Sequence, residues 1–393
     1  MTHFAADPVV ILSAARTPMG AFQGDFSGLS AHDLGAAAIR AAVARADIDP
    51  DSVGEVLMGN CLMAGQGQAP ARQAALQAGL PLSAGAVTLS KMCGSGMKAA
   101  MLAHDMLLAG SHALVVAGGM ESMTNAPHLL PKGRSGIRIG HGQVLDHMML
   151  DGLEDAYERG RSMGSFAEDC AAKYAFGREA QDAFAITSAQ RAEGAIEAEA
   201  FVGEITPVPV RDAIISVDEG PGKVRLDKIP LLRPAFRKDG TITAASSSSL
   251  SDGAAALVLT RASTASQMGC TPMARILGHA THAQAPAWFS TAPLGAVQKL
   301  LTKVGWQVHD VDLWEINEAF AVVPMALMAE LGLPHQRVNI HGGACALGHP
   351  IGASGARILV TLVYALRTHG LHRGVATLCI GGGEAVAMAI ELL

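Results

Sequence analysis

The sequence predicts an α/β protein in which buried strands alternate with helices. Short apolar runs such as VVIL, ALVVAGG and VATLCIGGG are uninterrupted, as strands covered on both faces usually are. Alanine-rich segments with helical character lie between them, and 50% of the 393 residues are hydrophobic. This alternation favours a layered α/β fold. The length is sufficient for two or three domains around a large core.

The first long helix is expected in LSAHDLGAAAIRAAVARA, where Ser30 or Asp33 can cap the first turn. The stretch 33–60, which contains most of this helix, resembles 293–317. Each has Leu-Gly, a helix, a turn with valine, a strand and a terminal asparagine. The sequence therefore contains a weak internal repeat.

A second pair of segments follows the same offset. Residues 95–98 open a helix that precedes a strand and Gly118-Gly119, and residues 354–357 open another before a strand and three glycines at 381–383. Both pairs are separated by about 260 residues, which indicates two similar halves.

Residues 121–249 have no counterpart in this repeat. Segments such as HLLPKGRSGIRIGHG and DEGPGKVRLDKIP are rich in glycine, proline and charge, which predicts an inserted, loop-rich domain over one face. We therefore expect one half from 1–120 plus 250–272, the insertion at 121–249, and the other half from 273–393.

Composition excludes several classes of partner. The net charge is -6 with 16% charged residues and no basic block, so nucleic acid is not expected. The start MTHFAADPVV lacks the features of a signal peptide, and the apolar C-terminal stretch is interrupted by glycines and glutamates, so we expect a cytosolic protein without a membrane span. Six scattered cysteines predict free thiols rather than disulfides or zinc. The histidines of HGQVLDH are expected to be solvated, and no metal site is predicted.

Cys93 lies at an expected strand end, before Gly-Ser-Gly and a helix start. Unpaired backbone N–H groups and the positive end of the helix dipole are expected to lower the pKa of its thiol. The glycines also allow a sharp turn that presents N–H groups to a developing oxyanion. Cys93 is thus a candidate nucleophile, and a buried structural cysteine is the alternative.

A thiol nucleophile needs a base. His349 is the best candidate, because its glycine-dense loop precedes the helix of the second half at the position equivalent to Cys93. Cys379 ends the equivalent strand of that half, and Asn317 closes WEIN with an amide that can hold a water. The alternatives are a loop histidine, a core thiol and a turn-forming asparagine.

Several of these motifs occur together in a known family. KMCGSGMKA, GGMESMTNAP, DGAAALVL, WEINEAFA, GGACALGHPIGASGAR and CIGGGEA resemble, in order along essentially the whole chain, the signatures of thiolases of the acetyl-CoA acetyltransferase branch. The resemblance implies two duplicated halves that form a five-layered α/β/α/β/α core with an inserted loop domain. That domain is expected to contribute to coenzyme A binding and to contacts between subunits.

The resemblance also implies a role for each candidate. Cys93 would be acylated and His349 would activate it. Cys379 would be the acid or base at the methyl carbon of acetyl-CoA. Asn317 would hold a water that, with Nε2 of His349, stabilises an enolate oxygen. The N–H groups of Cys93 and Gly381 would form a second oxyanion hole.

For coenzyme A, the resemblance implies contacts along the pantetheine tunnel and at the adenine. Ser162 stands where many relatives have histidine, TAASSSSLSDG replaces an Asn- and Gly-containing version, and an Arg-His pair is missing near the adenine, where Arg225 or Lys228 can substitute. The matching positions are Leu153, Met163, Phe236, Ala244, Ser248, Ala319 and Phe320.

The implied reaction is a reversible Claisen condensation of two acetyl-CoA to acetoacetyl-CoA and CoA, through an acyl-cysteine. No metal or redox cofactor is expected, because coenzyme A thioesters are the substrates. One alternative is a β-ketothiolase for longer or branched 3-ketoacyl-CoA, which Ser162 and an altered wall near Trp288 and Phe289 allow. Another is an inactive thiolase-like binding or scaffold subunit. A homotetramer is expected, with residues 128–141 at the contact between dimers.

Overall fold

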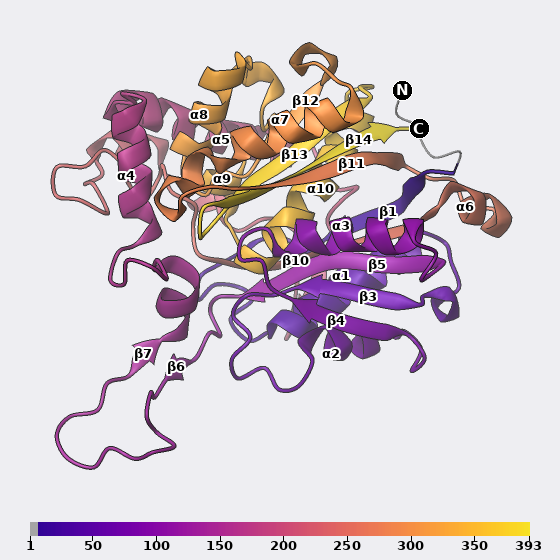
Figure 1. Cartoon of the computed structure of the whole chain (residues 1–393), viewed down its shortest axis with the longest axis horizontal. Coiled ribbons are helices and arrows are strands. Elements are labelled where there is room, and N and C mark those ends of the chain that lie inside the picture. The colour runs from indigo at the N-terminus through magenta and orange to yellow at the C-terminus, as the bar shows by residue number, and fades with distance from the viewer. Residues whose placement is uncertain (1–6) are drawn as a thin grey trace.

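The computed structural model describes residues 7–393, and within them ten strands form one continuous mixed sheet (Figure 1). The strand order is β12-β13-β14-β11-β1-β10-β5-β3-β4, and β2 pairs with β10. The two halves of this sheet meet between β1 and β11 through only two residue pairs, so each half curves away as a layer of its own. The N-terminal strands are β1 (Val9–Arg16), β2 (Gly20–Ala21), β3 (Glu55–Gly59), β4 (Gly85–Leu89), β5 (Leu114–Ser122) and β10 (Ser251–Arg261). The C-terminal strands are β11 (Ala274–Ala283), β12 (Leu313–Ile316), β13 (Arg373–Ile380) and β14 (Glu384–Leu392).

Helices fill the space on both sides of each layer. One apolar cluster joins α1 and α2 to the outer face of the N-terminal strands, another joins α7 and α8 to the outer face of the C-terminal strands, and a third surrounds α3 and α10 between the two. The result is the expected five-layered α/β/α/β/α core (Figure 1). These helices are α1 (Ala31–Arg45), α2 (Pro70–Gln77), α3 (Ser95–Leu108), α7 (Ala292–Val304), α8 (Val322–Leu331) and α10 (Ile351–Thr368).

Local sequence explains the predicted elements. Ser30 is the N-cap of α1, and its hydroxyl and the carboxylate of Asp33 form a capping box. The apolar runs become β1, β5 and β13, in which nearly every residue is buried. The repeat is also present, because α1 and β3 in one half correspond to α7 and β12 in the other.

Two details of the repeat were predicted wrongly. Gly118 and Gly119 lie inside β5 rather than after it. A Cβ on Gly119 would overlap the carbonyl oxygen of Gly352, so glycine here allows α10 to approach the strand closely. Helix α10 also begins at Ile351, three residues before Ser354.

The segment between β5 and β10 is more helical than its composition predicts. It opens with an exposed hairpin arm formed by β6 and β7, on which Ile139 is 95% exposed (Figure 1). His147 was expected to be solvated but is buried. Its ring nitrogens have partners in the protein: Nδ1 lies 2.6 Å from Asp151, and Nε2 accepts the N–H of Ala64. The elements are β6 (His128–Leu129), β7 (Leu145–Asp146), η2 (Met149–Leu153), α4 (Met163–Lys173), α5 (Arg178–Glu197), β8 (Val208–Val210), β9 (Ala213–Ile215), η3 (Pro221–Lys223) and η4 (Leu226–Leu231).

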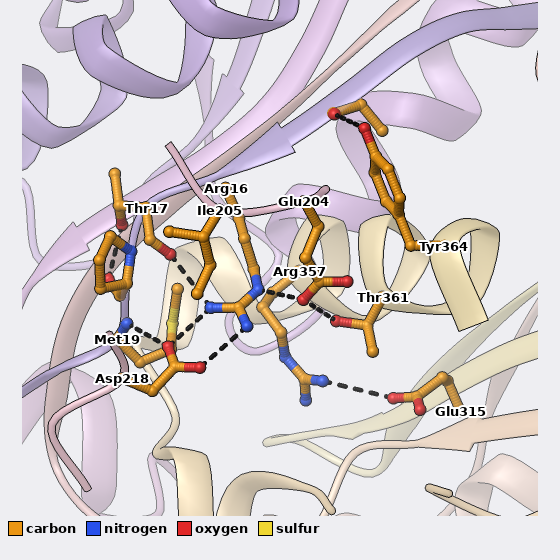
Figure 2. A network of polar contacts seen from close by, with 12 residues as sticks. Arg16, Thr17, Met19, Glu204, Ile205, Asp218, Glu315, Arg357, Thr361 and Tyr364 are labelled. Atoms are coloured by element: carbon orange, nitrogen blue, oxygen red, sulfur yellow. Dashed lines mark hydrogen bonds and ion pairs between the residues drawn. The ribbon is translucent and has the colours of Figure 1, made fainter. Parts of the chain in front are cut away.

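A buried polar network ties this segment to the core (Figure 2). Arg16 of β1 makes two hydrogen bonds to Asp218, at 2.6 and 2.9 Å, and a third to Glu204. Glu204 also accepts the hydroxyl of Thr361 from α10 at 3.1 Å. The charges are paired, as burial requires. The network therefore holds the inserted segment against α10.

The remaining elements are short connections. None of the helices in residues 7–393 combines the length and the apolar character that a membrane span requires. The domain limits stated above remain a prediction. These connections are η1 (Pro50–Ser52), α6 (Ala262–Met268), η5 (Pro286–Thr291), η6 (Val308–Asp310), η7 (His335–Arg337) and α9 (Ala344–Leu347).

Candidate active site

Cys93 lies in a tight turn between β4 and α3. The preceding Met92 has φ 47°, in the left-handed region that few non-glycine residues adopt. The hydroxyl of Ser95 stabilises this turn, because it donates to the carbonyl of Met92 at 2.6 Å and accepts the N–H of Lys91 at 2.8 Å. A backbone held in such a conformation is common at functional sites.

The pKa of Cys93 departs from the sequence-based expectation. Burial raises the pKa of this thiol to about 11, although hydrogen bonds from the N–H groups of Gly381 and Cys93 itself lower it. The prediction of a lowered pKa was therefore wrong in direction, because loss of water outweighs the backbone dipoles. The thiol is neutral at pH 7 and needs a base. The same N–H groups are the ones expected to form an oxyanion hole, and that role remains a prediction.

His349 presents an unused nitrogen in this region. It follows α9 in a loop where Gly348 has φ 98°, and Ile351, two residues later, packs in one apolar cluster with Cys93. Its Nδ1 lies 2.5 Å from Oγ of Ser354, whereas its buried Nε2 has no hydrogen-bond partner among residues 7–393. Burial, with the charge of Arg357, lowers the pKa of His349 to about 3. The ring is therefore neutral at pH 7.

The contacts of Ser354 allow either neutral tautomer of His349. Its hydroxyl lies 3.0 Å from the carbonyl of Pro350, to which it can donate while it accepts a hydrogen bond from the Nδ1–H group of His349. Alternatively, the hydroxyl donates to Nδ1. In the first case Nε2 is an acceptor, and in the second it is a donor. Ser354 was not among the residues that sequence analysis selected.

Cys379 and Asn317 come from neighbouring parallel strands of the C-terminal layer. Cys379 on β13 is fully buried, and burial followed by the charge of Cys93 raises the pKa of its thiol well above the ordinary value. Asn317 follows β12, and its N–H donates to Thr377 at 3.0 Å. Both amide atoms of the Asn317 side chain are buried without a partner among residues 7–393. Such a group is expected to bind a water or a ligand.

The turn that carries Gly381 packs directly on the turn that carries Cys93. A Cβ on Gly94 would overlap Cδ1 of Ile380, so a larger residue here would force the Ile380 side chain to move. Lys91, two residues before Cys93, forms an ion pair with Glu384 at the start of β14. Opposite charges therefore join the two turns at their outer side, and sequence analysis missed this pair.

Two buried carboxylates that sequence analysis also missed organise the loops around the site. Glu121 of β5 accepts the N–H groups of Cys61, Leu62 and Gly352 at 2.8–3.1 Å, and burial raises its pKa to about 7. Glu318 accepts the amide of Asn339 and the N–H of Cys345 in the other half. Glu121 and Glu318 occur in the motifs GGMESMTNAP and WEINEAFA. A carboxylate inside an apolar run is the sequence signal that could have identified them as buried polar residues.

The structure brings most of the predicted coenzyme A contacts close to this site. Leu153 shares an apolar cluster with Cys93, and Met163 at the start of α4 lies next to Gly381. The rings of Phe236 and Phe320 pack edge to face with centroids 5.7 Å apart. Phe236, Phe320 and Met163 belong to the apolar cluster that contains Cys379. Their contact with a pantetheine chain remains a prediction.

Of the other three positions, Ala244 and Ser248 lie on the connection that leads into β10, and Ala319 lies between β12 and α8. The N–H of Ser248 donates to the carbonyl of Ala319 at 3.0 Å, whereas Ala244 is exposed. Arg225 and Lys228 are also exposed, each 3.6 Å from Asp227. Their proposed contact with the adenine remains a prediction.

A hollow of about 510 Å³ opens beside the ring of Phe236. Phe236 and Ser162 line it together with three arginines, of which Arg237 pairs with Asp169 at 2.6 Å. Guanidinium groups suit the phosphates of a nucleotide, but Glu158 also lines the hollow, and Arg161 and Arg237 already pair with Glu158 and Asp169. The position of the charged end of coenzyme A remains a prediction.

Comparison with known proteins defines the class. Residues 9–263 match the family described as "Thiolase, N-terminal domain", and residues 270–392 match "Thiolase, C-terminal domain". Together with the duplicated layers and the paired thiols, these matches show that the chain belongs to the thiolase family.

Individual relatives span the whole chain. An acetyl-CoA acetyltransferase of Chromobacterium violaceum is 46% identical over 98% of this chain and 99% of its own length. Acetyl-CoA acetyltransferase 1 of Arabidopsis thaliana is 48% identical over 98% and 94%. The crystal structure of Acat5 thiolase from Ascaris suum in complex with coenzyme A has a TM-score of 0.94 and 43% identity, over 98% of this chain and all of that one. The acetyl-CoA acetyltransferase of Bacillus anthracis has a TM-score of 0.95 and 40% identity, over 98% and 99%.

Proposed function

We propose that the protein is an acetyl-CoA C-acetyltransferase that condenses two acetyl-CoA reversibly to acetoacetyl-CoA and CoA. The observation that carries this proposal is the set of groups around Cys93: the N–H of Gly381, which lowers the pKa of its thiol, the thiol of Cys379, whose pKa the charge of Cys93 raises, and Nε2 of His349, which has no hydrogen-bond partner among residues 7–393. The names of the relatives, and the coenzyme A bound to one of them, support the same substrate class.

The first half-reaction acylates Cys93. Nε2 of His349 removes the thiol proton, and the sulfur attacks the carbonyl carbon of acetyl-CoA. The N–H groups of Cys93 and Gly381 stabilise the negative oxygen of the tetrahedral intermediate. The carbon–sulfur bond to CoA then breaks, and His349 returns the proton to the leaving sulfur. The products are acetyl-Cys93 and CoA.

The second half-reaction forms the carbon–carbon bond. The thiolate form of Cys379, which has released its proton to solvent and is the minor form because burial raises its pKa, takes a proton from the methyl group of a second acetyl-CoA and becomes a neutral thiol. A water on the amide of Asn317 and Nε2 of His349, now the donor tautomer, stabilise the enolate oxygen. The enolate carbon attacks the acetyl group, the bond to Cys93 breaks, and Cys379 returns its proton to the sulfur of Cys93. No metal or redox cofactor is required for these steps.

The direct test is to detect the acyl-enzyme and to measure the substrate range. Mass spectrometry after mixing with acetyl-CoA should show one acetyl group on Cys93. CoA-dependent cleavage should be fastest for acetoacetyl-CoA in a ladder of longer and branched 3-ketoacyl-CoAs. Acetylation of another cysteine would refute the nucleophile assignment. A preference for longer chains would favour the alternative β-ketothiolase, which the bulky Trp288 and buried Phe289 near Phe320 motivate.

An inactive scaffold subunit is disfavoured, because Cys93, Asn317, His349 and Cys379 are all present, and Asn317 and His349 carry buried polar atoms without a partner among the described residues 7–393. We also propose a cytoplasmic homotetramer, in which the exposed β6–β7 arm contributes to the contact between dimers. The exposed Ile137, Ile139 and Val144 of that arm support this assembly.

A further inference from the structure

Three side chains that ligate metals in other proteins meet on the side of the molecule where α3 packs against β11. His104 and Asp105 lie near the end of α3, and His279 lies on β11. Oδ1 of Asp105 is 3.1 Å from Nδ1 of His104 and 2.9 Å from Nε2 of His279. One ligand atom from each of the three residues lies within 4.8 Å of the other two. Asp105 and His279 are 174 residues apart, so no sequence spacing predicts this cluster.

These separations fit a common coordination sphere. Zinc binds imidazole nitrogen and carboxylate oxygen at about 2.0–2.2 Å, so two such ligands are about 3.4 Å apart at the tetrahedral angle and about 3.0 Å apart at right angles. The two measured nitrogen–oxygen distances match the right-angle value and are slightly shorter than the tetrahedral one. Small shifts of the exposed carboxylate and of the two imidazoles, whose ligand atoms lie within 4.8 Å of each other, would place all three ligands on one ion. Water can complete the sphere from the open side, because the Asp105 side chain is 53% exposed while each histidine side chain is only 10% exposed.

Two cations of the protein face the cluster and act against a metal. Lys303 of α7 donates to the carbonyl of His279 at 3.2 Å, and its charge acts on both imidazoles. Arg261 acts on His104, but its Nε pairs with Asp7 at 3.2 Å, which offsets part of its charge. Lys303 is therefore the main repulsive group, and its removal provides a test of the electrostatics.

We propose that His104, Asp105 and His279 form a binding site for one divalent transition-metal cation of the Zn²⁺ class, which links α3 to the C-terminal sheet. Imidazole ligands favour such ions over Mg²⁺ or Ca²⁺. The ion is structural rather than catalytic, because His104 lies nine residues along α3 from Ser95, about 14 Å at 1.5 Å per residue, and thus far from Cys93. The ion would hold α3 in the central layer, and the first turn of α3 directly follows Cys93.

The experiment is a titration of the intact protein with Co²⁺, whose absorption spectrum shows whether sulfur is among the ligands. We expect one Co²⁺ per chain without a thiolate band, displaced by Zn²⁺. Both His279→Ala and Asp105→Asn should weaken binding by at least about 10–100-fold, and Lys303→Gln should strengthen it. His369→Ala is the matched control, because Nε2 of His369 lies 3.3 Å from Nε2 of His341 in a second histidine pair.

A second readout separates a metal site from a hydrogen-bonded clamp. In the wild type, Zn²⁺ at 100 times its Kd should raise the unfolding midpoint by roughly 3–5 °C. Asp105→Asn keeps an oxygen that can accept from the histidines, so it should fold normally and lose this rise. A thiolate spectrum, binding that survives in Asp105→Asn and His279→Ala, or the absence of Co²⁺ and Zn²⁺ binding would each overturn the proposal. Acetyl transfer by Cys93 is not part of the test.

Discussion

Replacement of Cys379 by alanine should separate acylation from carbon–carbon bond formation. The Cys379 side chain is fully buried on β13, and the groups whose charges act on it are Cys93, which carries the acetyl group, and the buried thiol of Cys170. Proton transfer should therefore depend on Cys379, and the Cys170 variant below tests the other thiol. The exchange of acetyl-CoA methyl protons with deuterium, and the net condensation, should therefore fall by about 10²–10⁴-fold.

Acylation should survive in this variant, because His349 and the N–H groups of Cys93 and Gly381 remain in place. Mass spectrometry of the protein after mixing with acetyl-CoA measures this step, and NMR of acetyl-CoA in D₂O measures the exchange. Cys379→Ser should be nearly as slow in exchange as Cys379→Ala, because a hydroxyl is a much weaker acid than a thiol.

Cys170→Ala is the matched control. Cys170 is equally buried in the same apolar cluster as Cys379 and close enough to raise its pKa. Each alanine variant removes one sulfur atom from the core and should lower the free energy of unfolding by about 1 kcal/mol. Only Cys379→Ala should lose proton exchange. Normal deuterium exchange in a folded Cys379→Ala protein that still accepts the acetyl group would refute the role of the second thiol.

Alkylation of Cys93 by iodoacetamide in the free protein should be slow at pH 7, and its rate should increase as the pH rises toward about 11. The reason is that burial raises the thiol pKa, so the reactive thiolate forms only above neutral pH. A labelling rate that reaches a plateau below pH 8 would contradict this. Lys91→Ala and Glu384→Ala should each slow acylation, because each removes the ion pair between the two turns. A double-mutant cycle on kcat/KM should show that the double variant is no slower than the slower single variant. Additive losses would show that Lys91 and Glu384 do not act as a unit. Deletion of residues 128–141 should convert tetramers into dimers in light scattering, and a wild type that is monomeric would refute the proposed assembly.

The order of strands and helices follows from local patterns that need no tertiary information. Uninterrupted apolar runs indicate strands buried on both faces, and Ser30 with Asp33 marks the start of α1. The repeat in the sequence predicts two halves for the same reason, since similar patterns form similar elements. The roles of Cys93, His349, Cys379 and Asn317 came from the resemblance of their motifs, and their chemistry remains to be tested.

Tertiary structure decided the properties that depend on surroundings. The pKa of Cys93 is raised rather than lowered, because the turn that places it beside backbone N–H groups also removes it from water. The Lys91–Glu384 pair and the cluster of Asp105 with His279 join residues far apart in the chain. A sequence shows which groups are present, but desolvation and charge interactions depend on distances that exist only after the two halves have packed around α3 and α10.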